Sequence, residues 1–231
     1  MPAKKIVVLT GAGVSAESGL STFRDAGGLW EGYDVYEVAS PQGWAKDKEL
    51  VLKFYNMRRR QLKDAKPNTA HYALAELEKK YEVIIITQNV DDLHERAGST
   101  NVVHLHGELT KARSTVSPYN IYEIGYNDID IGDKCEKGGQ LRPHIVWFGE
   151  PVPLMTEAAQ IAASADLFIV VGTSLVVYPA AGLLEYVSHK APKYIIDPAK
   201  PNVFGVHKNI EFHVEKATVG TPKLVERLMK E

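Results

Sequence analysis

Residues 5–16 read KIVVLTGAGVSA, and this stretch decides the fold class. A short β-branched run, Lys5–Thr10, leads directly into the glycine-rich turn Gly11-Ala12-Gly13-Val14-Ser15-Ala16. Glycines at these places let the backbone approach a pyrophosphate, and a following helix presents its N-terminus to the phosphates. Taken alone, the pattern is equally typical of a tight strand-to-helix turn without a ligand.

The sequence that follows this turn argues against a hydride-transfer enzyme. Dehydrogenases of the Rossmann type carry a second strand that ends in an acidic residue about 20 positions after the glycines. Here residues 28–34 read GLWEGYD, which is not a strand pattern. The turn therefore predicts another use of a dinucleotide.

Four more short apolar runs resemble buried parallel strands: residues 83–87, 102–105, 167–172 and 194–196. Helical patterns lie between or after them, at residues 69–80, 155–165 and 179–190. A last helix is expected to open with Thr221 as N-cap and Pro222 at its first position. This alternation predicts an α/β fold, a Rossmann-like parallel sheet with helices on both faces.

Two stretches interrupt the alternation. One contains a helical pattern at residues 47–64, and the other, residues 110–146, is polar and rich in turns. We expect both insertions to fold together into a small second domain, residues 32–66 and 110–146. The larger, dinucleotide-binding domain would then comprise residues 1–31, 67–109 and 147–231, with the ligand between the two domains.

Composition excludes several classes of protein. The chain has 231 residues, of which 45% are apolar and 24% charged, and a net charge of −2, so bulk charge attracts neither nucleic acid nor anionic lipid. Its single cysteine, Cys135, favours a reducing compartment, and no segment reaches the roughly 18 apolar residues of a membrane span. We expect a cytoplasmic monomer without nucleic-acid or membrane partners.

Five ordered segments resemble the signatures of the sirtuin family of NAD-dependent protein deacylases. They are GAGVSAESGLSTFRDAGGLW (11–30), TQNVDDLHERAG (87–98), HLHGEL (104–109), LRPHIVWFGE (141–150) and GTSLVVYPAAG (172–182). The sequence looks most similar to the bacterial CobB-type enzymes and to the class III branch. The resemblance implies that NAD is consumed as a co-substrate, and that the substrates are acylated lysine side chains of other proteins.

The same resemblance implies a set of NAD-binding residues. Asp91 is expected to hold the nicotinamide carboxamide and Asn89 to orient the ribose, while Asp197, which replaces the family's asparagine, disfavours NADP by repelling a 2′-phosphate. The full expected set is Gly11, Ala12, Gly13, Ser15, Ala16, Phe23, Arg24, Trp30, Gln88, Asn89, Asp91, Gly172, Thr173, Ser174, Asp197 and Ala217. Without the family, a polar strand-to-helix turn with capping residues would be the favoured interpretation of Gln88, Asn89 and Asp91.

Catalysis is expected to depend on His106, with Asn89. His104 and His106 share one face of any strand, so spacing alone does not choose between them. The resemblance chooses His106, because the family's base directly precedes Gly-Glu. It implies that the acyl oxygen attacks C1′ of the nicotinamide ribose, nicotinamide leaves, and 2′-O-acyl-ADP-ribose forms after His106 removes a ribose proton.

The substrate is expected to contact two segments. Val146, Trp147, Phe148 and Gly149 resemble the wall of the acyl-lysine tunnel, although Val146 and Phe148 also fit an ordinary core strand. Tyr55 and Arg58 lie three residues apart on one helix face and resemble the class III pair that binds succinyl or malonyl carboxylates. The alternative is that residues 58–60 are a solvated basic face.

The family's zinc site is not expected here. Four ligands hold a structural zinc, whereas this chain has one cysteine and carries RSTVS at residues 113–117, where the first cysteine pair is expected. We therefore predict no metal, with an apolar cluster of its own instead, made of Tyr119, Ile121, Tyr122, Ile124, Tyr126, Ile129 and Ile131. Two other functions stay open, a mono-ADP-ribosyltransferase and a non-catalytic NAD sensor.

Overall fold

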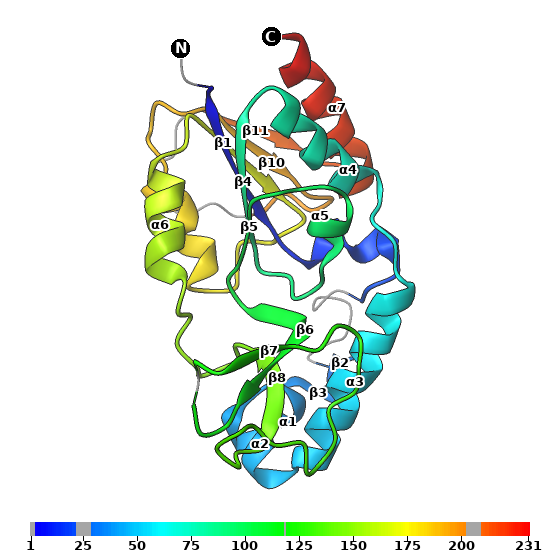
Figure 1. The fold of residues 1–231 in the computed structure, drawn as a ribbon. Coiled ribbons are helices and arrows are strands. Elements are labelled where there is room, and N and C mark those ends of the chain that lie inside the picture. Colours follow the sequence, from blue (N-terminus) through cyan, green and yellow to red (C-terminus); the bar gives the residue numbers. More distant parts are fainter. Residues whose placement is uncertain (1–2, 22–28, 118, 202–208) are drawn as a thin grey trace.

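The computed structural model describes residues 3–21, 29–117, 119–201 and 209–231, and it contains a parallel sheet of six strands (Figure 1). The strand order is β11-β10-β9-β1-β4-β5, so β1 lies between β4 and β9. The strands are β1 (Lys5–Thr10), β4 (Glu82–Thr87), β5 (Val102–His104), β9 (Leu167–Val171), β10 (Lys193–Ile196) and β11 (Ile210–His213). The predicted Rossmann-like α/β sheet is confirmed, and β11 is an addition that the sequence did not indicate.

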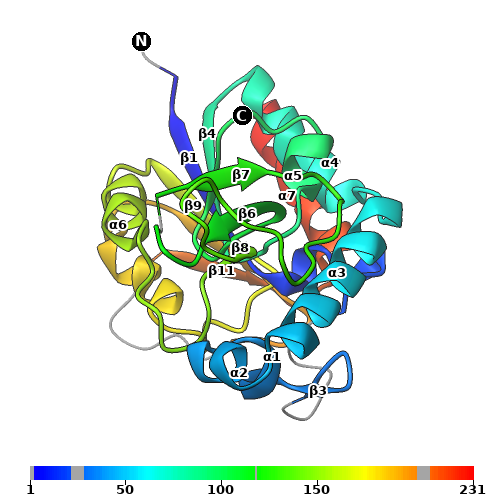
Figure 2. The ribbon, with the colours of Figure 1, turned by 60° about the horizontal axis from the view of Figure 1, so that its bottom comes forward.

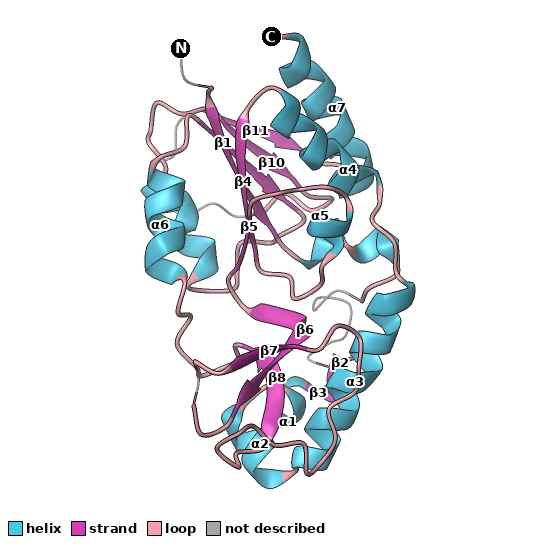
Figure 3. Ribbon diagram, viewed as in Figure 1, coloured by secondary structure: helices cyan, strands magenta, loops and turns pink. Residues whose placement is uncertain are grey.

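Helices cover both faces of this sheet, which is why its central strands β1, β4 and β9 are mostly apolar. Along β1, Ile6 and Val8 pack towards α4 (Thr69–Glu76) and α7 (Ala217–Lys230). Val7 and Leu9 point the other way, towards α6 (Met155–Ala163) and the 3₁₀ helix η4 (Ala180–Tyr186). Figure 3 shows these two helical layers flanking the strands.

A second core lies below the carboxyl ends of the strands in the view of Figure 1. It joins an antiparallel sheet, β7 (Ile121–Glu123), β6 (Gly107–Ser114) and β8 (Leu141–Ile145), to the helices α1 (Val35–Val38), α2 (Pro41–Lys46) and α3 (Lys48–Asp64). Figure 2 shows α3 running along one side of this sheet. A two-stranded ribbon, β2 (Leu29–Trp30) and β3 (Tyr33–Asp34), completes it.

Trp30, Leu109 and Trp147 also pack in this second core, although each lies within the predicted NAD-binding ranges. The predicted domain boundaries are not decided by this packing and stay a prediction.

The last helix begins earlier than expected, so the prediction of Thr221 as its N-cap is wrong. Helix α7 starts at Ala217 and contains Pro222 in its second turn. Because proline has no N–H, it cannot donate to the carbonyl of Thr218, four residues before it. The hydroxyl of Thr69 in α4 donates to that carbonyl instead, at 2.9 Å, and so supports the helix through its proline.

Other elements differ in type or length. The glycine-rich turn leads into two single 3₁₀ turns, η1 (Ala12–Val14) and η2 (Ala16–Ser18), where we expected the start of a helix. The helix expected at residues 179–190 is the shorter 3₁₀ helix η4. Short elements complete the chain, namely η3 (Leu77–Lys79) after α4 and α5 (Leu93–Arg96) after β4. Within the described ranges, no helix combines the length and apolar character that a membrane crossing requires.

The expected separate apolar cluster of residues 119–131 is not present. Ile129 is buried in the second core, and Tyr122, Ile124 and Tyr126 pack against the same core. Tyr119, Ile121 and Ile131 are exposed. The segment is short and polar enough that it cannot bury its own apolar side chains, so it shares the core of α3.

Candidate functional site

Two glycine turns interlock at the carboxyl end of β1 and β9. The N–H of Gly13 donates to the carbonyl of Gly172 at 2.9 Å. A Cβ atom on Gly13 would lie 2.8 Å from Gly172 Cα, and one on Gly172 would lie 2.3 Å from the nitrogen of Val14. Gly172 also has a φ of +63°, which favours glycine. These glycines therefore serve the contact between the two turns, and the Gly13 N–H is already occupied.

Three predicted NAD-binding side chains meet beside these turns. Ser15 Oγ donates to Asp91 Oδ2 at 3.0 Å, and Asn89 Nδ2 donates to Ser15 Oγ at 3.1 Å. All three residues are buried. Burial raises the pKa of Asp91, although the hydrogen bonds from the Leu93 N–H and from Ser15 partly offset it. The structure thus brings together residues from the β1 turn and the β4 turn, as expected for carboxyl ends of neighbouring parallel strands.

Gln88 links this group to two further residues of the predicted set. Its Nε2 donates to Thr173 Oγ1 at 3.3 Å, across the end of β1. Its carbonyl oxygen accepts from His106 Nδ1 at 3.1 Å. The polar groups of three strand ends, β1, β4 and β9, and of the turn after β5 therefore lie side by side.

The three neighbouring histidines differ in their surroundings. His104 is buried and its Nε2 lies 2.7 Å from Glu95 Oε1; burial lowers its pKa, but the Glu95 contact outweighs this and the pKa is raised. His94 is buried beside Thr10, and burial holds its pKa well below the usual range. His106 is half-buried, and because β5 ends at His104 the two side chains are not equivalent.

For His106, burial lowers the pKa and the Gln88 carbonyl offsets this only in part. Because Nδ1 donates to that carbonyl, the neutral ring carries its free lone pair on Nε2. The side chain is therefore a neutral base at pH 7.

His71 belongs to the site although the sequence analysis did not select it. Its Nδ1 accepts from the N–H of Asn68 in a capping box at the start of α4, which leaves the proton on Nε2, 3.4 Å from Ser15 Oγ. The ring also packs edge-on against His94 at 4.9 Å. Asn68 preceding a helical pattern marks the cap, but no sequence signal links it to Ser15.

The predicted acyl pair lies on α3, facing the second core. Tyr55 has no exposed surface and Arg58 is 8% exposed. The guanidinium of Arg58 stacks on Trp30 at 3.9 Å, and its buried Nη1 has no hydrogen-bond partner among the residues that the structure describes. Burial lowers the pKa of Arg58 to about 10, opposed by Tyr55 and by the carboxylates of Glu31 and Asp91.

Arg58 is therefore not part of a solvated basic face, because it is buried. That alternative holds for Arg60, which pairs with Asp128 at the surface. Trp30, which was expected at the NAD, stacks against Arg58, and its place at the NAD stays a prediction.

The predicted tunnel residues follow β8 and differ in their exposure. Phe148 and Gly149 are exposed and Val146 is half-buried, so these can line a channel. Trp147 is 2% exposed and lies in the second core, where its indole Nε1 donates to Tyr55 Oη at 3.0 Å. No local pattern in the sequence distinguishes Trp147 from its neighbours.

Glu150 fastens this segment to the antiparallel sheet. Its carboxylate accepts from the N–H of Trp147 at 2.8 Å and pairs with Arg113 of β6 at 2.8 Å and Arg142 of β8 at 2.7 Å. Arg142 also lies over the Trp147 ring, with its Cζ 3.2 Å from the centroid. The chain from residue 146 to 150 is therefore held at both ends.

The remaining predicted positions lie at the far edge of the sheet. Asp197 follows β10 and is buried, with Oδ1 accepting from the N–H of Ala199 at 2.9 Å, and Ala217 is buried at the first position of α7. Phe23 and Arg24 lie outside the described residues.

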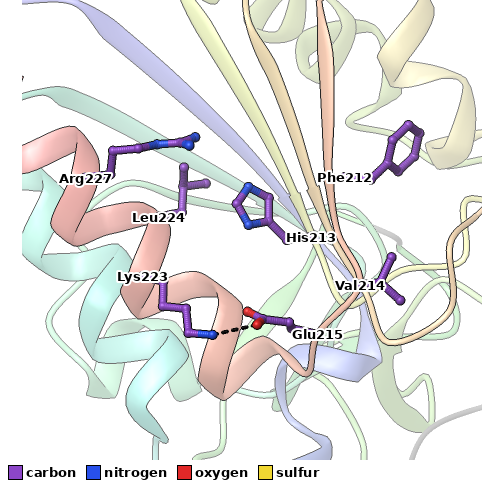
Figure 4. Close-up of a pocket in the computed structure, with 7 residues that line it drawn as sticks. All are labelled: Phe212, His213, Val214, Glu215, Lys223, Leu224 and Arg227. Atoms are coloured by element: carbon purple, nitrogen blue, oxygen red, sulfur yellow. Dashed lines mark hydrogen bonds and ion pairs between the residues drawn. The ribbon is translucent and has the colours of Figure 1, made fainter.

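A pocket of about 440 Å³ lies beside this edge (Figure 4). Its lining residues are Phe212, His213, Val214, Glu215, Lys223, Leu224 and Arg227. The two cations are already paired, Lys223 with Glu215 at 2.6 Å and Arg227 with Glu211 at 2.9 Å. None of the predicted site residues lines it, and we assign no ligand to this pocket.

Backbone donors at the interlocked turns fit a nucleotide. The N–H groups of Ala12, Thr173 and Ser174 donate to no acceptor in the described part of the chain. Such groups at strand ends suit phosphate and ribose oxygens.

No metal site is found among the described residues, which include no group of three or more His, Cys, Asp or Glu side chains that fits an ion. The expected absence of zinc stays a prediction.

Comparison with known protein families shows to which family this chain belongs. The Sir2 family model matches residues 11–179, more than half of the chain. The chain belongs to the Sir2 family. Similar proteins described as NAD-dependent protein deacylases include one from Bacteroides thetaiotaomicron, 54% identical over 98% of both chains. Another, from Helicobacter pylori strain J99, is 53% identical and covers 99% of this chain and 98% of the relative.

Solved Sir2 structures agree with the fold. A Sir2 homolog–NAD complex superposes with a TM-score of 0.88 at 44% identity, covering 99% of this chain and 90% of that one. A complex described as Sir2-p53 peptide-NAD+ has a TM-score of 0.79 at 28% identity, covering 99% and 95%. The predicted Sir2-type identity is confirmed, and the relatives' names agree with the predicted class of enzyme, an NAD-dependent protein deacylase.

Proposed function

We propose that this Sir2-family enzyme removes acyl groups from protein lysine side chains, including the acidic succinyl and malonyl groups as well as acetyl. In this proposal NAD is the co-substrate, and the products are the free lysine, nicotinamide and 2′-O-acyl-ADP-ribose. The NAD is held by the interlocked turns and by Ser15, Gln88, Asn89, Asp91 and Thr173. The donors without acceptors at Ala12, Thr173 and Ser174 support this placement.

His106 is the proposed general base. The acyl oxygen of the substrate attacks C1′ of the ribose, the C1′–nitrogen bond breaks and nicotinamide leaves with the bonding electrons. His106 Nε2 then accepts the proton of the 2′-hydroxyl, so that the 2′-oxygen bonds to the acyl carbon. The bond from the acyl carbon to the lysine nitrogen breaks and one water molecule adds to the acyl carbon, which releases the free lysine and leaves 2′-O-acyl-ADP-ribose. A neutral, half-buried ring with its Nδ1 proton fixed on the Gln88 carbonyl supports this role.

The preference for acidic acyl groups depends on one observation, the buried Arg58, whose Nη1 has no partner in the described part of the chain. An unpaired guanidinium is costly in a protein interior, and a carboxylate is the group that satisfies it best. A hydrogen bond to a charged group contributes about 1.5 to 3 kcal/mol, which corresponds to roughly a 10- to 100-fold preference. Acetyl-lysine therefore remains a substrate.

The test uses purified protein, NAD and matched acetyl- and succinyl-lysine peptides, with products identified by mass spectrometry. Arg58→Met is expected to lower the succinyl-to-acetyl ratio of kcat/KM by 10-fold or more. His106→Tyr is expected to abolish both activities. Arg60→Met is the matched control, because Arg60 lies on the same helix but is exposed. A ratio that is the same in Arg58→Met as in the control contradicts the acidic preference.

A further inference from the structure

The Tyr55 hydroxyl takes part in a hydrogen bond whose donor and acceptor are known. Its oxygen accepts a hydrogen bond from Trp147 Nε1 at 3.0 Å. An indole nitrogen only donates, so in this pair the phenol is the acceptor and its own proton is left for a second partner. Within the described ranges no group accepts that proton. Both side chains are buried, with Tyr55 at 0% and Trp147 at 2% exposure.

A second unsatisfied donor lies next to it. Arg58 follows Tyr55 by three residues on α3, and its buried Nη1 likewise has no partner within residues 3–21, 29–117, 119–201 and 209–231. The two donors therefore lie on one helix face. One phenol O–H and one guanidinium N–H together suit a ligand that offers two acceptor oxygens and a negative charge, as a carboxylate does.

We infer that Trp147 is a positioning residue for acyl specificity: by occupying the acceptor side of the Tyr55 hydroxyl, it directs the phenol proton to the acyl carboxylate beside Arg58. This inference rests on the proposed function, and it concerns the binding of the acidic acyl group, with no contact between Trp147 and the substrate. Without the indole donor, the hydroxyl is free to rotate and loses its preset orientation.

The surroundings of Trp147 fix the indole in this orientation. Arg142 lies over its ring at 3.2 Å, its backbone N–H is bonded to Glu150, and Trp44 of α2 packs against it with ring centroids 5.7 Å apart. Burial raises the pKa of Tyr55 to about 12, so the phenol keeps its proton throughout the range of enzyme assays. Tyr55 therefore remains a donor at neutral pH.

The test compares kcat and KM for succinyl and acetyl peptides in Trp147→Phe, Tyr55→Phe and Trp44→Phe. Trp147→Phe is expected to lower the succinyl-to-acetyl ratio of kcat/KM about fivefold, through a higher KM for the succinyl peptide. Trp44→Phe is the matched control, because the same change is made in the same core without a bond to Tyr55. In a Tyr55→Phe background, Trp147→Phe is expected to leave the ratio where Tyr55→Phe puts it.

Benzothienylalanine introduced at position 147 replaces the indole N–H by sulfur at nearly constant shape, and it gives the same comparison if Trp147→Phe does not fold. If the wild type removes succinyl groups and the change at position 147 leaves the succinyl-to-acetyl ratio unchanged, the inference is overturned and the proposed function stands. A ratio that falls equally in Trp44→Phe also overturns it, because the effect is then one of packing. A wild type that does not remove succinyl groups overturns both.

Discussion

His106 and His104 are separated by one residue, yet only His106 combines partial exposure with a neutral ring. A base must be unprotonated to act, so activity falls as the pH drops through its pKa. Because burial lowers the pKa of His106 below 6.5, we expect the acid limb of the kcat/KM profile to lie below pH 6.5. An acid limb centred above pH 7 contradicts this assignment. Gln88, whose carbonyl accepts from Nδ1, sets the ring orientation.

At the scale of single residues, the sequence predicted the meeting of Ser15, Asn89 and Asp91, because side chains that follow neighbouring parallel strands share one edge of the sheet. It did not predict the role of His71 or the burial of Trp147. Both depend on contacts between segments far apart in the chain, His71 with Ser15 and Trp147 with Tyr55. Local sequence patterns carry no information on such pairs.

Helix α3 holds the loop around Ile129, which lies in the segment where we predict no zinc. Asn56 Nδ2 donates to the carbonyl of Ile129 at 3.0 Å, and its Oδ1 accepts from the Ile129 N–H at 3.0 Å. Arg59, fully buried, bonds to Asn56 and to the carbonyl of Leu109. The side chains of one helix thus satisfy the backbone of two other segments.

We expect Asn56→Ala to lower the free energy of unfolding by about 2 kcal/mol, because it leaves buried groups of Ile129 and Arg59 without partners. Chemical denaturation measures the change. In the same experiment, a zinc chelator is expected to leave the wild-type midpoint unchanged. A midpoint that falls with chelator, together with zinc in the purified protein, contradicts the predicted absence of a metal.

The hydrogen bond from Thr69 of α4 to the Thr218 carbonyl of α7 can be tested by mutation. Thr69→Val removes the hydroxyl that bonds the Thr218 carbonyl, and we expect a loss of about 0.5 to 1 kcal/mol, since Thr69 is exposed. In a Pro222→Ala background the helix supplies its own donor to that carbonyl, so the same change is expected to cost less. A double-mutant cycle by thermal unfolding measures the difference. Costs that are equal in the two backgrounds contradict the explanation.

The strands of the sheet were predictable because each is a short β-branched run between turn signals. Strand β11, IEFH, is an edge strand that contains Glu211 and His213, and it gave no such run. The antiparallel sheet of β6, β7 and β8 was missed because its strands are rich in charged and polar residues, such as GELTKARS. Their partners are set by the second core, which the local sequence does not show.

Nucleotide binding is expected to raise the melting temperature of the whole molecule. A ligand that binds only the folded state adds about 2.7 kcal/mol at 100 times its Kd. We expect NAD to raise the Tm and NADP to raise it much less, because the carboxylate of Asp197 repels a 2′-phosphate. Asp197→Asn is expected to narrow this difference. Equal shifts with NAD and NADP in the wild type contradict the placement of the ribose at Asp197.

The second core has one further consequence, which concerns spectroscopy. All three tryptophans of the chain, Trp30, Trp44 and Trp147, pack in it, and none lies in the six-stranded sheet. Tryptophan emission therefore reports on this core alone, whereas far-ultraviolet circular dichroism averages over the entire backbone. Unfolding curves that coincide by the two methods indicate one cooperative unit, and curves that separate give the order in which the two cores melt.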